Sequence, residues 1–246
     1  MKIIFLGTNG WYDTDTGNTL CVLIETHSEF IVLDAGNGIY KLDKYIKSGK
    51  PIFLFISHMH LDHLIGLHVL NKFNFKQGIN IFGPPGTRKS LSLLINKPFS
   101  LRIKQLVTKI KINDLNKGTR LPLDMQFRKL RHTALCYGYR FNLEGKIITF
   151  CTDTGLCPNL FKLAEGADLF IAECSLRPGQ VNEEWPHLNP QMAAAAASKA
   201  KVKRLALVHF DAALFTDFHM RKSAEKHAKT AFKNTFSALD GQAVVL

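Results

Sequence analysis

Short apolar runs alternate with polar or glycine-containing stretches along most of the chain. Runs such as Ile52–Ile56 and Arg204–Val208 have the length and the branched or aromatic residues that are typical of strands buried in a sheet. The opening run, Lys2–Leu6, is too short for a signal-peptide core and predicts a first strand. In contrast, the alanine-rich segment Ala193–Ala197 predicts a well-packed helix, and Asn189 is a plausible N-cap for it.

The same pattern predicts further strands. The stretch Tyr137–Lys146 is predicted to form two strands joined by a tight Glu-Gly turn. His68 lies in the apolar segment Leu64–Leu70, which is expected to form a helix, and is expected to be a hydrogen-bonded histidine in the core or at its boundary. The other predicted strands are Phe30–Leu33, Ile79–Phe82, Phe127–Leu130, Lys146–Thr152 and Phe170–Glu173.

The most unusual polar cluster comes directly after the Ile52–Ile56 run. Three imidazoles and one carboxylate occupy six consecutive positions there, and each ring nitrogen would need a partner in a core. Alternate residues of an extended segment point to the same side, so His58 and His60 can converge on one ion. Asp62 and His63 follow where the chain has begun to turn, so they can face a second ion. The cluster therefore predicts half of a two-metal site.

Two ions need further ligands, and these should lie at the ends of other apolar segments. Three such residues follow predicted strands, namely His132, Asp153 and His209. The carboxyl ends of strands are where loops gather and where polar groups can face a cleft. Asp153 is the natural bridging ligand, because one carboxylate can bind two cations and offset their mutual repulsion.

These motifs resemble the metallo-β-lactamase superfamily, and within it the ribonuclease Z-like branch. The resemblance runs nearly end to end, from Phe5-Leu6-Gly7-Thr8 and Leu33-Asp34-Ala35-Gly36 through the histidine cluster to Gly83-Pro84-Pro85-Gly86-Thr87. It implies an α/β fold of the four-layer αββα type, with two mixed sheets flanked by helices in one domain over residues 1–246. Two residues match further elements of that branch: Glu173 after a strand, and His187 in Pro186-His187-Leu188-Asn189-Pro190.

The resemblance also implies roles for these residues. One metal would take His58, His60 and His132, the other Asp62, His63 and His209, with Asp153 joining them. A metal-bridging hydroxide would be the nucleophile, and Asp62 could orient it. His187 would protonate the leaving oxygen or bind a phosphate oxygen, with Glu173 holding its imidazole, and Asp34 would accept a hydrogen bond from a ligating imidazole. Zinc is the default for such a site, although manganese or iron would fit the same ligands.

The favoured function is hydrolysis of phosphodiesters, in RNA or in small nucleotide or cyclic substrates. Relatives that mature tRNA commonly carry a long arm between the positions of His132 and Asp153, which here lie only 21 positions apart. The sequence therefore favours smaller or less structured diesters. A carbon-centred hydrolase, acting on a lactone, thioester or lactam without needing His187, is one alternative. A non-catalytic metal-binding regulator is a second, disfavoured because all seven ligands are present.

Composition changes this picture little. The 246 residues carry a formal net charge of +12, which would attract a phosphate-bearing substrate but is also common in proteins that bind none. Gly83–Ser90 resembles a phosphate-binding loop, but Arg88 stands where the glycine before the lysine is required. Five cysteines without zinc-finger spacing indicate reduced thiols and a cytoplasmic protein. No run is long enough to span a membrane, and a homodimer is left open.

Overall fold

A computed structural model describes residues 1–246 and contains two large β-sheets. The first sheet has the strand order β15-β1-β3-β4-β5-β6-β7. Its strands pair antiparallel from β15 to β4 and parallel from β4 to β7, so the sheet is mixed. The strands are β1 (Lys2–Gly7), β3 (Cys21–Glu25), β4 (Phe30–Leu33), β5 (Ile52–Phe55), β6 (Ile79–Gly83), β7 (Ile110–Asp114) and β15 (Ala243–Val245).

The second sheet repeats this plan in the order β14-β12-β11-β10-β9-β8. It is antiparallel from β8 to β10 and parallel from β10 to β14. Its strands are β8 (Met125–Lys129), β9 (Tyr137–Leu143), β10 (Lys146–Cys151), β11 (Leu169–Glu173), β12 (Leu205–Val208) and β14 (Thr235–Ser237). Two short strands, β2 (Asn9–Gly10) after β1 and β13 (Phe210–Asp211) after β12, pair with each other in parallel and so connect the two halves of the molecule.

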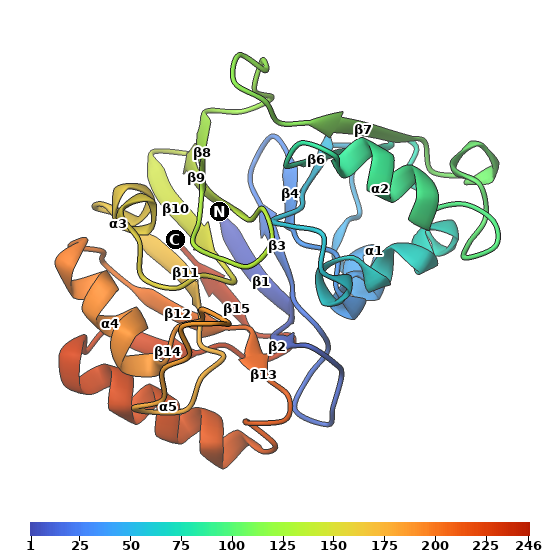
Figure 1. Ribbon diagram of the computed structural model, residues 1–246. Helices are drawn as coiled ribbons and strands as arrows, with labels where there is room; N and C mark the ends of the chain where they lie inside the picture. Colours follow the sequence, from blue (N-terminus) through green and yellow to red (C-terminus); the bar gives the residue numbers. More distant parts are fainter.

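Helices cover the outer face of each sheet (Figure 1). On the first sheet these are α1 (Leu42–Tyr45) and α2 (Thr87–Leu94), together with the 3₁₀ segments η1 (Asn37–Lys41), η3 (Ile65–Lys72) and η4 (Ile103–Gln105), which pack in the same apolar cluster. A further 3₁₀ segment, η2 (Leu61–His63), lies in the loop after β5. On the second sheet they are α3 (Pro158–Ala164), α4 (Pro190–Lys199) and α5 (Phe218–Ala231). The expected four-layer αββα arrangement with two mixed sheets is therefore confirmed.

Three apolar clusters fill the spaces between these four layers. Ile4 and Leu6 pack in the cluster under the helices of the first sheet, whereas Ile3 and Phe5 pack in the cluster between the sheets. This alternation follows from the two-residue repeat of a strand. The third cluster joins the second sheet to α3–α5 and contains most of the alanines of α4. Asn189 caps α4 as expected, because its side chain accepts a hydrogen bond from Met192 N at 2.8 Å.

Several local expectations can be compared with the structure. The tight Glu-Gly turn is present, and Glu144 and Gly145 both have positive φ, as a two-residue hairpin turn requires. Gly83–Ser90 forms the turn after β6 and the start of α2. The expectation for His68 was wrong: its side chain is exposed on the 3₁₀ segment η3, where Nδ1 lies 2.6 Å from Ile65 O. None of the helices combines the length and apolar character that a bilayer-spanning segment needs.

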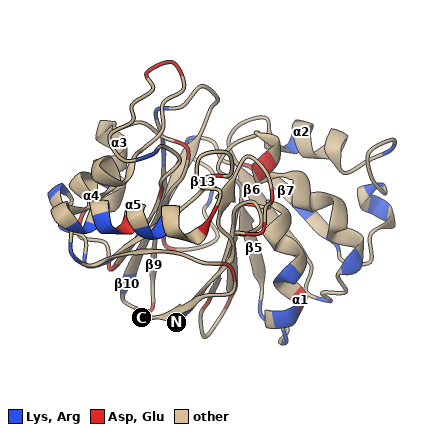
Figure 2. Ribbon diagram, turned by 90° about the horizontal axis from the view of Figure 1, so that it is seen from below, with Lys and Arg blue, Asp and Glu red and all other residues tan.

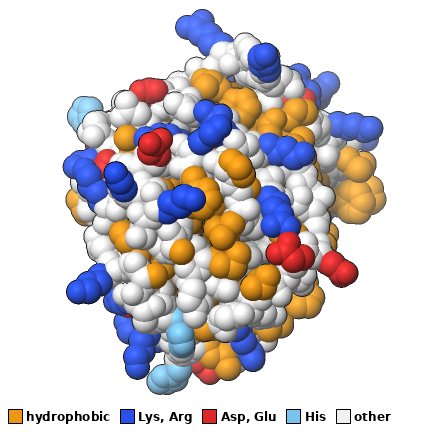
Figure 3. Space-filling view, turned by 60° about the vertical axis from the view of Figure 1, so that its left-hand side comes forward, with side chains coloured by type: hydrophobic (Ala, Val, Ile, Leu, Met, Phe, Trp, Pro, Cys, Tyr) orange, Lys and Arg blue, Asp and Glu red, His pale blue; other side chains and the backbone are white.

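The basic side chains lie mainly on the outer helices, including α1 and α5 (Figure 2). On the face shown in Figure 3, Lys and Arg are scattered among apolar side chains and do not form one continuous patch. The positive charge is therefore spread over the outside of the sandwich.

Candidate metal centre

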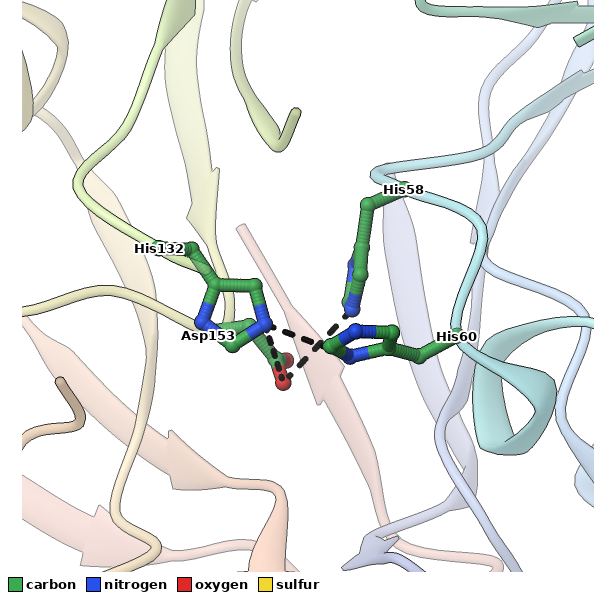
Figure 4. Close-up of side chains that lie close together, drawn as sticks. All are labelled: His58, His60, His132 and Asp153. Carbon is green, nitrogen blue, oxygen red and sulfur yellow. Dashed lines mark hydrogen bonds and ion pairs between the residues drawn. The ribbon is translucent and has the colours of Figure 1, made fainter. Parts of the chain in front are cut away.

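The first group of candidate ligands converges from three loops. His58 and His60 follow β5, His132 follows β8, and Asp153 follows β10. Figure 4 shows the four side chains pointing toward a common centre. His132 Nε2 lies 3.2 Å from His60 Nδ1 and 3.9 Å from Asp153 Oδ2, and His58 Nε2 lies 3.8 Å from the same oxygen. We refer to these four residues as the first cluster.

The second group lies directly beside it. Asp62 and His63 come from η2, and His209 lies between β12 and β13. The Nε2 atoms of His63 and His209 are 3.1 Å apart, and Asp62 Oδ2 lies 3.2 Å from His209 Nε2. Asp153 Oδ1 lies 3.2 Å from His63 Nε2 and 3.3 Å from His209 Nε2. One oxygen of Asp153 therefore faces the second cluster (Asp62, His63, His209) and the other faces the first.

The backbone around the site is unusual. Six residues other than glycine have positive φ, and four of them lie here: Trp11 (70°), Asp34 (57°), Asp153 (48°) and His209 (53°). Side chains disfavour this left-handed region, and such outliers gather at functional sites. Asp34 and His209 directly follow β4 and β12, and Asp153 is the second residue after β10. The left-handed turn at each strand end lets the side chain face the gap between the two sheets.

Hydrogen bonds on the far side of three imidazoles fix their tautomers. Ser57 Oγ donates to Asp34 Oδ2 at 2.8 Å, so it accepts from His58 Nδ1 at 3.0 Å. Ser175 Oγ donates to His209 O at 2.9 Å, so it accepts from His209 Nδ1 at 2.8 Å. His63 Nδ1 donates to Asp34 Oδ2 at 2.7 Å, in agreement with the role expected of Asp34. In each neutral ring, Nε2 therefore carries a lone pair that faces the clusters.

This donor set fits metal ions. The lone pairs of His63 Nε2 and His209 Nε2 face each other across 3.1 Å, which is favourable only with a proton or a cation between them. His58 Nε2 is fully buried and has no hydrogen-bond partner, although it points at the centre of the first cluster. A buried imidazole nitrogen without a partner is costly unless it binds something. The side chains therefore suit divalent cations with imidazole and carboxylate ligands.

The two clusters differ in their electrostatics. Burial lowers the pKa of His58 well below its usual value, and burial lowers the pKa of His132 to about 4. Burial also opposes a charge on His63, but Asp62, Asp153 and Asp34 together raise its pKa well above the ordinary value. The first cluster therefore presents neutral imidazoles, whereas the carboxylates of the second cluster favour a positive charge.

A second carboxylate–imidazole pair lies at the edge of the site. Glu173 ends β11, and its Oε1 accepts hydrogen bonds from His187 Nδ1 at 2.8 Å and from Thr154 N at 2.5 Å. Burial lowers the pKa of His187, but the charge and hydrogen bond of Glu173 outweigh it and raise this pKa to about 9. The His187 ring centroid lies 5.3 Å from that of His132 and 5.9 Å from that of His209. His187 also forms an alternative ligand group with Asp153 and His209.

A cavity of about 460 Å³ opens over both clusters. Asp62, Asp153, His187 and His209 line its floor, and no lysine or arginine lines it. The chain has two tryptophans, Trp11 and Trp185, and both lie in its wall. The basic character of the protein is thus absent from the cavity itself.

The structure brings together every site residue that the sequence suggested. All seven candidate metal ligands lie in the two clusters, and the Glu173–His187 pair lies beside them. Four contributors were missed: Ser57, Ser175, Trp11 and Trp185. Ser57 directly precedes the histidine cluster and could have been noticed there. The other three had no recognisable spacing in the sequence.

Comparisons with known proteins agree with this arrangement. A family model described as "Beta-lactamase superfamily domain" matches residues 30–210. The chain is 24% identical to a protein named Ribonuclease Z from Nitrosopumilus maritimus, with 92% of this chain and 95% of that protein covered. Its structure is similar to that of human tRNase Z, short form (25% identity, TM-score 0.78, covering 100% and 99% of the two chains). The metallo-β-lactamase fold protein YhfI from Bacillus subtilis shares 22% identity (TM-score 0.82, covering 99% and 98%).

Proposed function

The chain belongs to the metallo-β-lactamase superfamily, and from that premise we propose that it is a two-metal phosphodiesterase. Its substrates would be RNA or small nucleotide and cyclic phosphodiesters, the class to which its ribonuclease relatives point. The observation that carries the proposal is the position of Asp153, which turns one oxygen to each cluster within the cavity that also contains His187.

We propose zinc as the metal at both positions, held by His58, His60 and His132 on one side and by Asp62, His63 and His209 on the other. Asp153 would contribute to both. The imidazole-rich donor set supports this choice. Divalent cations held there would supply Lewis acidity, lowering the pKa of water and neutralising charge on a phosphoryl group.

The remaining chemistry belongs to the protein's own side chains. His187 Nδ1 donates to Glu173, so Nε2 is the nitrogen left to meet a substrate. In this position a protonated His187 can give its proton to the departing oxygen. Glu173 is held by the amides of Thr154 and Ser175, which fixes the orientation of the imidazole. Asp62 accepts a hydrogen bond from Trp11 N at 3.0 Å and is placed to orient the attacking group.

Two features support a small or weakly structured phosphodiester as the substrate. A phosphodiester carries one negative charge, which suits a cavity whose wall has no lysine or arginine. The segment between His132 and Asp153 is a short hairpin with a two-residue turn, and it leaves no room for an arm that would grip a folded RNA. The alignment with the Nitrosopumilus protein is 288 positions long but covers only 92% of this 246-residue chain, so that relative carries many residues that this chain lacks.

The proposal is tested by hydrolysis of bis-p-nitrophenyl phosphate with protein whose metal content has been measured. We expect turnover by protein with two zinc ions per chain, and loss of turnover to background in Asp153→Ala. Asp217→Asn, which removes the capping carboxylate of α5 outside the cavity, is the matched control and should remain active. Short single-stranded RNA and cyclic nucleotides should then be cleaved faster than a tRNA precursor. Fully metallated protein that cleaves lactones or thioesters but no phosphodiester would overturn the proposal.

We further propose that the protein works as a homodimer in a reducing cytoplasm. All five cysteines are free thiols and four of them are buried, which supports a reducing compartment. Dimers are the commonest soluble assembly, and analytical ultracentrifugation tests this part directly.

A further inference from the structure

Trp185 is held over the first cluster. Its ring is nearly parallel to that of His60, at an interplanar angle of 9° and a centroid distance of 5.6 Å, and it meets the His132 ring edge-on at 5.8 Å. Nevertheless 48% of the residue is exposed. Within its loop, Asn182 Oδ1 accepts from Trp185 N at 2.9 Å, and the neighbouring Glu183 pairs with Arg131 after β8. Trp185 therefore presents an ordered aromatic surface at the cavity wall.

Trp11 occupies the corresponding place beside the second cluster. Its backbone N–H donates to Asp62 Oδ2 at 3.0 Å, and 66% of the residue is exposed. The preceding Gly10 packs so closely on His209 that a Cβ there would lie 2.6 Å from the imidazole. Asn9 anchors the same loop by donating to Tyr12 O at 3.1 Å. The loop is thus seated on two candidate ligands, and a left-handed residue at its tip turns the indole into the cavity wall.

Exposed tryptophans need an explanation on energetic grounds. Burying a large apolar side chain stabilises a protein, so leaving both tryptophans about half or more exposed forgoes part of that gain. Both lie in anchored loops, one beside each cluster, and both line the same cavity. Indoles positioned in this way provide flat surfaces on which aromatic groups of a ligand can stack.

Building on the proposed function, we propose that Trp11 and Trp185 are the specificity-determining residues of the site. Each would stack one nucleobase on either side of the phosphate that is cleaved. The substrate class is then a diester between two nucleosides, in single-stranded form, because bases in a duplex have no free face. Stacking on aromatic side chains tolerates every base, since every base has a π-face, so the cleavage would show little sequence preference.

Two p-nitrophenyl diesters test this proposal in the zinc-loaded protein. One is the p-nitrophenyl ester of thymidine 5′-monophosphate, and the other is p-nitrophenyl methyl phosphate, which has the same leaving group and no base. Stacking of one base is worth about 1–3 kcal/mol, so kcat/KM should favour the nucleoside ester about fivefold or more. This ester carries one base and so engages one of the two indoles. Either Trp185→Leu or Trp11→Leu should therefore reduce the preference, with the effect in KM, while the other variant should leave it unchanged. Phenylalanine at the sensitive position should retain most of the preference. Phe99→Leu, at an exposed aromatic position outside the cavity, should leave it unchanged.

Fluorescence provides a readout that does not depend on turnover. Because the chain has two tryptophans, Trp11→Phe leaves emission from Trp185 alone, and the reverse holds for Trp185→Phe. Adenosine 5′-monophosphate should quench the emission in both variants, whereas methyl phosphate should not. Equal kcat/KM for the two esters, together with no quenching, would overturn the inference while leaving the phosphodiesterase intact. Quenching without hydrolysis of either ester would support the nucleotide site and overturn the proposed function.

Discussion

The site contains the same pair of functional groups twice. Asp34 accepts from His63 Nδ1 at 2.7 Å, and Glu173 accepts from His187 Nδ1 at 2.8 Å. Both carboxylates are fully buried at strand ends, and in both pairs the carboxylate raises the pKa of the imidazole against the effect of burial. The pairs differ in what faces the other ring nitrogen. This difference gives one imidazole the environment of a metal ligand and the other that of a proton donor.

The two environments can be described atom by atom. Nε2 of His63 lies within 3.4 Å of three polar atoms, from His209, Asp153 and Asp62. His187 instead borders the open cavity, and its ring lies beside the His132 and His209 imidazoles at centroid distances of 5.3 Å and 5.9 Å. A carboxylate behind an imidazole thus sets the orientation and basicity of the ring in both places. The role of each imidazole then depends on the groups that face its Nε2 atom.

The largest expected effect comes from breaking the Asp34–His63 pair. Asp34 accepts from Ser57 N, Ser57 Oγ and His63 Nδ1 inside the protein, so Asp34→Ala leaves three buried donors without a partner. We expect the free energy of unfolding to fall by about 3–5 kcal/mol, as when one partner of a buried pair is removed. Urea denaturation and metal analysis of the purified variant measure both consequences.

Asp34→Asn sharpens this test, because asparagine tolerates the left-handed backbone. Its amide would donate toward His63 and favour the tautomer with the proton on Nε2. We expect a smaller loss of stability than in Asp34→Ala, with loss of metal from the second cluster. An Asp34→Asn protein that keeps two metals would show that the side chain at position 34 does not control the tautomer of His63.

The next largest effect should come from His187→Ala on a substrate with a poor leaving group. Loss of a general acid reduces the rate about 10²–10⁴-fold when the departing alkoxide needs a proton, as in RNA. The p-nitrophenyl esters leave as stable anions, so their hydrolysis should fall much less. Steady-state kinetics on both substrate types reveal this difference. Metal content below two per chain in the variant would instead place His187 among the ligands, as in the alternative group with Asp153 and His209.

A smaller effect is expected from Glu173→Gln, which keeps the shape of the side chain but removes its charge. Outer partners of this kind are worth about 10–100-fold in activity. RNA cleavage should fall by that amount with both metals retained, and bis-p-nitrophenyl phosphate hydrolysis should change little. Equal losses of activity on the two substrates would contradict the assignment of the Glu173–His187 pair to proton donation and of the Asp34–His63 pair to metal binding.

The smallest effect concerns pH in the metal-free protein. The pKa of His187 is raised to about 9, above its value near 6.5 in an unfolded chain. Its contribution to stability is therefore complete below about pH 6.5 and is lost as the pH rises through about 9. Imidazole NMR signals should give the high pKa of His187 directly, and Glu173→Gln should lower this pKa because only the more weakly acting Asp153 would then oppose burial. A His187 pKa that stays near 9 in Glu173→Gln would disprove this cause.

Much of the fold could be predicted from the sequence because the apolar runs have a clear two-residue or continuous pattern. The candidate ligands could be predicted because each follows such a run, and strands in one sheet bring their ends together. The tautomers could not, since they depend on Ser175 reaching His209 from a different loop. The tryptophans were missed for a similar reason: Trp11 and Trp185 are 174 positions apart and meet only across the cavity.

The exposure of His68 shows that an apolar segment does not fix the burial of each of its residues. Its neighbours Leu67 and Leu70 are buried, but the segment winds as a 3₁₀ helix, and His68 points away from them. With three residues per turn, the apolar stripe falls differently from that of an α-helix. The apolar composition therefore predicted that the segment packs on the core, but it did not predict which of its residues are buried.

The left-handed residues at the strand ends also matter for anyone who engineers this scaffold. At Asp153 and His209 a glycine would relieve an unfavourable backbone conformation, whereas at Asp34 the loss of three buried hydrogen bonds would outweigh that relief. Screens that select only for heat resistance in the absence of metal would therefore tend to enrich substitutions at the positions on which metal binding is proposed to depend. Directed evolution of this chain should keep zinc and substrate in every round, so that robustness is not selected at the expense of the catalyst.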